Sequence, residues 1–472
     1  MTVVAPVALR IKIANGLGSV AYGVKDNGFS TFLLIFYSQV VGLAASLVSL
    51  ALMVALLIDA IVDPIIGHLS DRTYTRWGRR LPWLYLAPIP LAFSWMLLWS
   101  PPEDHQYIFL YLIVCAILVR TLISCCEVPS QSLVAELTMD YDERTDITRM
   151  RYLFAWGGGL LVFFLANSVF LRADATHKYG QLNPEGYWNY GLAGAILMAG
   201  SVILSALGQH KRIAHFPEHR PVKTSLRHSF GEVIESLRHP AALILLGATA
   251  IAITSTQMTF TISNFLYLYV WRFDETAFAW LPWMLIASVT VMFFLVAPLH
   301  RRFGKKQTAI VCGVIATVFW TTPYLLRLAG IWPEEGTRNS TLLLFGFVFL
   351  TNVIAVMVSV SAQSMLADVV EASFEETGRR TEGVFASGWI FVQKIGTAVG
   401  IGITGLLIDL SGMPRKAIPG QVPAAVIDNL TTAYIAIVIF AAAASTYAFL
   451  RFPISRADHE ERVRVLAAQN KA

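Results

Sequence analysis

Charged residues are scarce in this chain of 472 amino acids, where Asp, Glu, Lys and Arg make up only 14%. An average soluble domain contains about 25%. Hydrophobic residues make up 56%, and the mean hydropathy is +0.59. The four cysteines all lie inside apolar runs, so we expect no disulfide framework. This composition disfavours a soluble enzyme, a nucleic-acid-binding protein and a disulfide-rich secreted domain.

Other signatures are missing as well. The sequence contains no Walker A motif, which argues against transport driven by ATP hydrolysis. Asp59 and Asp63 form an Asp-x3-Asp pair that also occurs in intramembrane Mg²⁺-dependent transferases, but the second Asp-rich cluster of such enzymes is missing. A transferase is therefore a remote alternative, and we predict no catalytic residues. We also expect no cleavable signal peptide before the first apolar run.

Long apolar runs are what the chain has instead. Crossing a bilayer takes about 20 residues in a helix. Twelve runs reach this length: 14–40, 45–68, 82–101, 107–135, 151–171, 188–208, 241–269, 279–298, 307–328, 341–366, 384–410 and 431–450. The sequence thus predicts an all-α membrane protein with 12 transmembrane helices and both termini on one side.

Lys and Arg are distributed unequally between the two sets of loops. The termini and the loops on their side hold 26 of the 36, whereas the opposite loops hold 7. The positive-inside rule then places both termini in the cytoplasm, with the chain in the plasma membrane, or the inner membrane of a bacterium. The net charge of +5 reflects this topology, so we expect no nucleic-acid partner.

The chain also contains an internal repeat. The turn Arg76-Trp77-Gly78-Arg79-Arg80 is matched 226 residues later by Arg302-Phe303-Gly304-Lys305-Lys306, and Ala135-Glu136 is matched 232 residues later by Ala367-Asp368. Two similar six-span halves in one orientation resemble the major facilitator fold, in which substrate binds between the halves. We predict a first bundle over 1–210, a cytoplasmic linker over 211–239, a second bundle over 240–455 and a cytoplasmic tail over 456–472.

Charged side chains inside the spans are informative, because placing one at a helix centre costs roughly 2.5–3.5 kcal/mol. Asp59 and Asp63 are four residues apart and therefore share one helical face. Two carboxylates this close repel each other unless a cation or a proton lies between them. The pair is a candidate site for a coupling ion, Na⁺ or H⁺; the alternative is a permanent salt bridge to Lys394 or Arg151.

Further polar residues predict a substrate cavity beside this pair. Lys25 and Asp26 are consecutive in the first span, which must turn a polar side away from lipid. The carboxylate of Asp26 either accepts hydrogen bonds from substrate hydroxyls or pairs with a base opposite. Glu127 and Ser124 lie one turn apart and extend the ion site or contact substrate. Arg120 either neutralises Glu127 or extends to the membrane surface.

Loops on the side of the termini carry charges of both signs. The loop after the second span offers Asp71 and Arg72, and the loop after the tenth offers Arg379 and Arg380 beside acidic residues. Ion pairs between the halves would hold the outward-facing state and break when the protein opens inward. The alternative is that these charges only set topology.

Several segments resemble one family, the glycoside–pentoside–hexuronide:cation symporters, of which the melibiose permeases are the best-known members. The matching segments cover nearly the whole chain: Lys25-Asp26-Asn27, 59–67, Ser70-Asp71-Arg72-Thr73, 76–83, 136–145 and 378–394. The resemblance implies symport of a sugar or glycoside with a cation by alternating access. We further expect a monomer in lipid that has no cofactor apart from the coupling ion.

The resemblance also implies roles for single residues. Asp59 and Asp63 match the family's cation-binding carboxylates, and Ser124 matches a hydroxyl ligand of the cation. The predicted substrate-binding residues are Lys25, Asp26, Glu127, Arg151 and Lys394, of which the last two match bases that link the sugar and cation sites.

Two positions depart from the family pattern. Val62 stands where melibiose permease has an asparagine that is associated with Na⁺ use. The identity of the coupling ion, Na⁺ or H⁺, therefore stays open. Gln131 replaces a tryptophan that stacks on the sugar, which argues against a galactoside. Lysolipid symporters belong to the same branch, so a lysolipid or another amphiphile is the alternative substrate.

Overall fold

The computed structural model describes residues 7–102, 105–138, 140–174, 177–214, 240–377 and 382–453. These ranges contain helices and no strand. The helices of the first half are α1 (Leu9–Leu17), α2 (Val20–Asn27), η1 (Gly28–Phe32), α3 (Leu33–Ile35), η2 (Phe36–Val41), α4 (Ala45–Arg72), α5 (Leu81–Leu86), α6 (Pro88–Leu98), η3 (His105–Tyr107), α7 (Ile108–Leu137), α8 (Tyr141–Leu165), η4 (Ala166–Phe170), η5 (Gly180–Leu182) and α9 (Pro184–Ile213). Those of the second half are α11 (Pro240–Phe265), η6 (Leu266–Val270), α12 (Glu275–Phe303), α13 (Lys305–Leu328), α14 (Arg338–Thr377), α15 (Glu382–Leu410) and α16 (Ala424–Leu450).

The helices account for all twelve predicted spans, although two of the spans are not single helices. Within the described ranges, 10 helices are long and apolar enough to cross a membrane. The first predicted span is built from α1 to η2, and the third from α5 and α6. Pro88 begins α6 and has no N–H for a helical hydrogen bond to the preceding turn. This explains the interruption between α5 and α6 in the third span. The all-α, twelve-span prediction is confirmed in this form.

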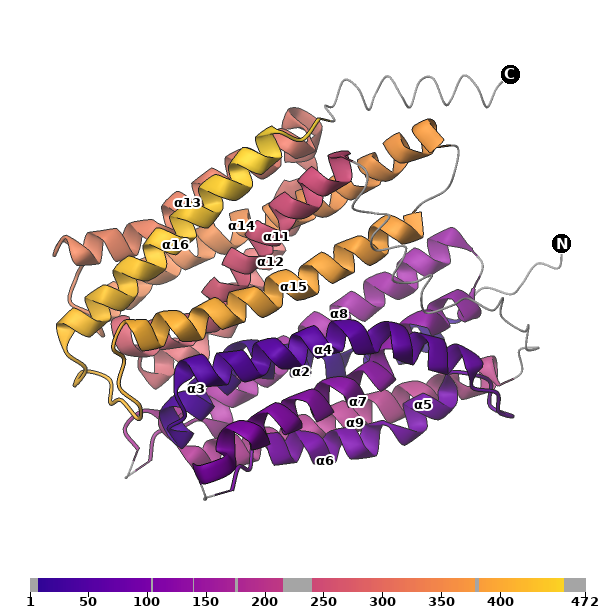
Figure 1. The fold of residues 1–472 in the computed structure, drawn as a ribbon, viewed down its shortest axis with the longest axis horizontal. Helices are drawn as coiled ribbons and strands as arrows, with labels where there is room; N and C mark the ends of the chain where they lie inside the picture. Colours follow the sequence, from indigo (N-terminus) through magenta and orange to yellow (C-terminus); the bar gives the residue numbers. More distant parts are fainter. Residues whose placement is uncertain are drawn as a thin grey trace.

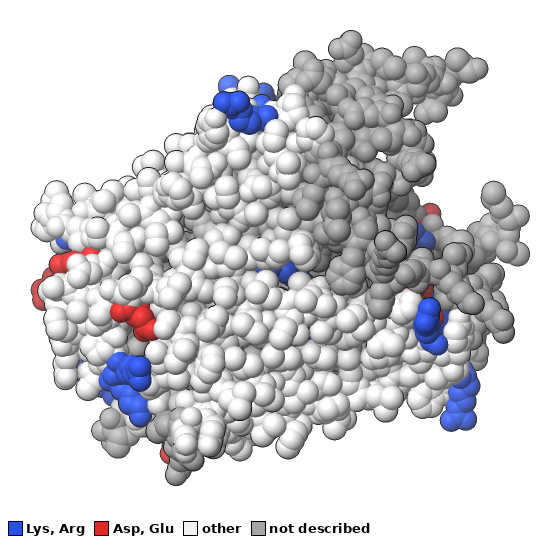
Figure 2. Space-filling view, in the orientation of Figure 1, with Lys and Arg blue, Asp and Glu red and all other residues white. Residues whose placement is uncertain are grey.

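The two halves lie side by side, with α4 of the first half packed along α15 of the second (Figure 1). Inside the first half, α2 packs on α8, α4 on α7 and α6 on α9; inside the second, α13 packs on α14 and α11 on α15 and α16. On the face shown in Figure 2, charged residues gather towards the ends and leave a largely uncharged band between them. An uncharged band of this kind suits the hydrocarbon core of a bilayer.

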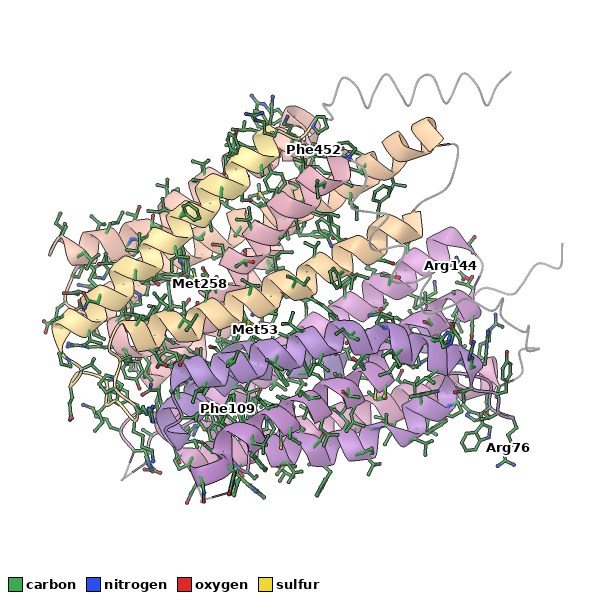
Figure 3. All side chains as sticks on the ribbon, viewed as in Figure 1. Met53, Arg76, Phe109, Arg144, Met258 and Phe452 are labelled. Carbon is green, nitrogen blue, oxygen red and sulfur yellow. The ribbon has the colours of Figure 1, made fainter. Side chains whose placement is uncertain are left out.

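Glycines allow several of these helices to approach backbone to backbone. A Cβ at Gly23 of α2 would overlap the carbonyl oxygen of Ala155 in α8. Between the halves, a Cβ at Gly405 of α15 would overlap atoms of Ser49 in α4, and one at Gly402 would lie 2.8 Å from Sδ of Met53 (labelled in Figure 3). Small residues at helix contacts are the usual means of close packing inside a membrane.

One end of the interface between the halves is held by a cap that crosses it. Asp409, near the end of α15, accepts hydrogen bonds from the backbone N–H groups of Ala45 at 3.1 Å and Ser46 at 2.9 Å, and from the Ser46 hydroxyl. Ala44, the N-cap residue of α4, supplies no side-chain cap of its own. A residue of the second half therefore stabilises the first turn of a helix in the first half.

Other hydrogen bonds between the halves lie at the same end. The Gln39 side-chain oxygen accepts from the Ala417 N–H at 2.9 Å and from the Tyr269 hydroxyl at 3.3 Å, and the Asn264 amide donates to the Thr31 carbonyl at 3.0 Å. The helices of the two halves diverge away from this end (Figure 1). Arg76 and Arg144, which belong to the arginine-rich set, both lie towards the opposite end (Figure 3).

Candidate substrate and cation site

The predicted carboxylate pair lies where α4 faces α7 and α15. Asp59 is only 4% exposed. Its Oδ1 accepts a hydrogen bond from the Ser124 hydroxyl at 2.8 Å, and its Oδ2 lies 3.2 Å from Nη1 of Arg120 and 2.8 Å from Nζ of Lys394. The same Nζ lies 2.5 Å from Oδ2 of Asp63. The structure thus brings Asp59, Asp63, Ser124 and Lys394 together, in the salt-bridged form that sequence reasoning weighed as an alternative.

Lys394 is the link between the halves at this site. It belongs to α15 in the second half, whereas both carboxylates belong to α4 in the first. Oδ1 of Asp63 is buried and accepts no hydrogen bond from the described residues. One carboxylate oxygen at the pair is therefore available to a cation or a proton.

Arg120 is placed differently from its predicted positions. It is 5% exposed, so it does not extend to the membrane surface, and its ion pair is with Asp59 rather than Glu127. Its guanidinium carbon lies 4.6 Å from the ring centroid of Phe29, a favourable cation–π distance. Glu127 lies two helical turns further along α7, a rise of about 10 Å. The guanidinium of Arg120, which lies at the depth of Asp59, is therefore too far from Glu127 to pair with it.

A second charged group surrounds Lys25. Its Nζ lies 2.9 Å from Oδ1 of Asp26 and 3.7 Å from Oε2 of Glu127, and Gln131 donates to Oε1 of Glu127 at 3.2 Å. Asp26 therefore pairs with its neighbour on α2 and not with a base opposite. Its side chain stays 67% exposed, which leaves carboxylate oxygen free for another donor. The predicted residues Lys25, Asp26 and Glu127 are brought together by these contacts.

Arg151 lies in a separate, neutral polar network. Its Nη1 donates to the Ser130 hydroxyl at 2.7 Å and to the Asn15 side-chain oxygen at 3.2 Å. Asn15 in turn donates to Gln209 at 2.8 Å. No ion pair of Arg151 is found among the described residues, so the structure does not join it to Asp59 or Asp63. Sequence reasoning missed Asn15, a polar residue inside the first apolar run, and Gln209, which directly follows the sixth.

Of the predicted gating charges that the structure describes, Asp71 forms an ion pair inside the first half. Asp71 lies 2.9 Å from Arg80, and Arg79 lies 3.1 Å from Glu136. The repeat-related pair in the second half is Lys305 with Asp368 at 2.6 Å. Arg72 is exposed, and Arg379 and Arg380 lie outside the described residues. An ion-pair latch between the halves stays a prediction.

Neutralising Asp71 tests that latch. We expect Asp71→Asn to favour the inward-facing state, because it removes one acid from the surface that would face the second half, while Arg80 keeps its ion pair with Glu136 at 2.9 Å. An exposed pair contributes about 0–1 kcal/mol, so the shift in the equilibrium is at most about fivefold. The measurement is the labelling rate of a single cysteine introduced in the part of α15 that lies towards the arginine-rich loops, with the four native cysteines replaced. An unchanged rate would favour a role in topology alone.

Comparison with known proteins identifies the family and the fold. Residues 14–456 match the family model described as MFS/sugar transport protein, and the chain belongs to this family of the major facilitator superfamily. It is a multi-pass membrane transporter. The crystal structure of the nucleoside transporter NupG shares the fold, with a TM-score of 0.64 and 14% identity over 94% of this chain and 98% of that one.

Two curated relatives are similar over most of their length. The isoprimeverose transporter of Lactiplantibacillus pentosus is 25% identical over 413 residues, which cover 85% of this chain and 80% of that protein. The sodium-dependent lysophosphatidylcholine symporter 1-A of Danio rerio is also 25% identical, over 85% of this chain and 78% of that protein.

Proposed function

We propose that this chain is a secondary active transporter that moves a sugar or glycoside together with Na⁺ or H⁺ by alternating access. The observation that carries the proposal is the pair formed by the buried Asp59 and the partly buried Asp63 on one half, bridged by Lys394 from the other. A cation or proton at this pair changes the contact between the halves. Occupancy of the ion site and the conformation of the transporter are therefore linked, as symport requires.

The substrate site of the proposal is the group formed by Lys25, Asp26 and Glu127, with Arg151 beyond it. Asp26 and Glu127 offer carboxylate oxygens as acceptors, and Lys25 offers N–H donors between them. Sugar hydroxyls need both kinds of partner, because a buried hydroxyl without one costs about 1–3 kcal/mol. Arg151 has no carboxylate partner in the described residues and suits the acid group of a hexuronide. The family description and the isoprimeverose transporter support a carbohydrate.

A lysolipid is the second candidate, favoured by the similarity to the lysophosphatidylcholine symporter. Such a substrate needs one charged pocket and a long apolar slot. The candidate substrate and cation residues carry charges of both signs over several helices, which fits a polyhydroxylated molecule better.

The remaining parts of the proposal concern the orientation of the chain in the membrane, its oligomeric state and its lack of enzymatic activity. The excess of Lys and Arg in one set of loops supports cytoplasmic termini and an inner-membrane location if the source is bacterial. We propose that the transporter acts as a monomer and has no enzymatic role. Residues 215–239 and 454–472, which hold most of the predicted linker and tail, lie outside the described residues.

A ligand screen tests the substrate class. We expect purified protein to be stabilised against thermal unfolding by one class among glycosides, pentosides and hexuronides, because a ligand that binds only the folded state raises its stability. Lysolipids below their micelle concentration serve as the competing set. Stabilisation by lysolipids, with none by any sugar, would contradict the proposed substrate.

A further inference from the structure

Arg120 brings a permanent positive charge to the candidate ion site. Its Nη1 lies 3.2 Å from Oδ2 of Asp59, and both side chains are almost completely buried. The aromatic ring of Phe29 covers the guanidinium at 4.6 Å. An arginine side chain stays protonated in proteins, so the positive charge of Arg120 is permanent.

Arg120 and Asp59 belong to the same half and move together. Arg120 is on α7, Asp59 is on α4, and these two helices pack against each other within the first half. Lys394, the other cation at Asp59, is on α15 of the second half. When the halves rearrange, Lys394 moves relative to the carboxylates, whereas Arg120 stays beside Asp59.

This placement changes what the carboxylate pair can attract. With Arg120 present, the first half holds one uncompensated negative charge at the pair instead of two. Oδ2 of Asp59 already accepts from the guanidinium, and Oδ1 accepts from Ser124. Val62, one residue before Asp63, offers no side-chain oxygen. An alkali ion prefers several oxygen ligands and a negative field, and both are reduced here.

We propose that Arg120 is a tethered counter-ion that takes the place of an alkali ion beside Asp59, so that this residue sets the ion selectivity and weakens binding of Na⁺ and Li⁺. The inference rests on the proposed function. Of the two coupling ions that the proposed function leaves open, it disfavours Na⁺.

The test uses Na⁺ alone on the full chain purified in detergent. The thermal unfolding temperature is measured in NaCl and in choline chloride at equal ionic strength, and then with LiCl. Wild type and Arg120→Lys, which keeps the charge, are expected to show no difference between the salts. Arg120→Gln is expected to be stabilised by Na⁺, with an apparent Na⁺ affinity at least about tenfold tighter than that of wild type.

Two controls separate charge at the site from loss of an arginine in general. Arg327→Gln removes another largely buried arginine, which pairs with Glu335 and Asp428 elsewhere, and no Na⁺ response is expected. The double variant Arg120→Gln with Asp59→Asn restores the charge balance at the pair and is expected to lose the response gained by Arg120→Gln.

The outcomes that overturn the inference are equally direct. The inference is wrong if Na⁺ raises the unfolding temperature of wild type as much as that of Arg120→Gln. It is also wrong if Arg120→Gln unfolds cooperatively and its unfolding temperature does not change with Na⁺. If Arg120→Gln does not fold, binding of radioactive sodium to wild type decides, because tight saturable binding contradicts the inference and its absence supports it. No sugar is present in these measurements, so a failed sugar screen leaves the result on Arg120 intact.

Discussion

Asparagine in place of Asp59 or Asp63 is expected to abolish cation-driven accumulation of substrate while downhill exchange survives. Each substitution removes half of the negative charge that holds Lys394 and the coupling ion. Without an ion bound at the pair, the ion gradient no longer biases the conformational change, and a coupling of about 1–3 kcal/mol, typical of linked sites, is lost. Asp59→Asn additionally leaves the buried Arg120 without its carboxylate partner, so it is expected to be the less stable variant.

The measurement is uptake into membrane vesicles with an imposed Na⁺ gradient and, separately, an imposed H⁺ gradient. Downhill exchange in the same vesicles reports whether the transporter is folded and binds substrate. Asp428→Asn is the matched control, because Asp428 pairs with Arg327 in the second half and does not contact the candidate site. Full accumulation by both Asp59→Asn and Asp63→Asn would refute the assignment of the ion site.

Removing the carboxylate of Asp409 is expected to favour opening at the end of the molecule where α4 begins and α15 ends. Asp409 caps the first turn of α4 from the other half, so the cap exists only while the halves are in contact there. Loss of a helix N-cap costs about 0.5–2 kcal/mol. A loss of about 1–2 kcal/mol shifts the equilibrium between the closed and open forms 5–30-fold.

Labelling of single cysteines at the two ends of the interface measures this shift for Asp409→Ala. Labelling is expected to rise at the end that holds Gln39 and Ala417 and to fall at the opposite end. Asp274→Ala is the control, because Asp274 caps α12 by accepting from Ala277 at 2.7 Å inside one half. Equal labelling patterns in the two variants would mean that the Asp409 cap contributes only local helix stability.

Much of this molecule follows from features that are local in sequence. The apolar runs predict the helices, and the spacing of Asp59 and Asp63 predicts that they share a face. The breaks in the first and third spans are harder to predict, because Gly and Pro are tolerated in membrane helices and interrupt only some of them.

The partners of buried polar residues are not local, and sequence reasoning did not find them. Asp409 caps a helix 364 residues earlier, and Asn15 meets Gln209 across 194 residues. The sequence suggests Glu127 as a partner for Arg120, because both lie in one apolar run, but the partner is Asp59 and is set by the depth at which α4 passes α7. That depth depends on how whole helices pack, which the local pattern of one chain does not contain.

The glycines between α4 and α15 give the contact between the halves a mechanical character of its own. At Gly405, α15 lies against the Ala45 carbonyl and the short side chain of Ser49. At Gly402, the flexible side chain of Met53 lies where a Cβ would be. Interlocked side chains resist sliding because each must change rotamer or be compressed. At glycines, few rigid side chains interlock, so we expect α4 and α15 to slide past each other at a low energetic cost. We therefore expect the barrier to turnover to depend on the polar contacts on either side of these glycines, those of Asp409 and of Lys394, and the speed of transport to change when those contacts change.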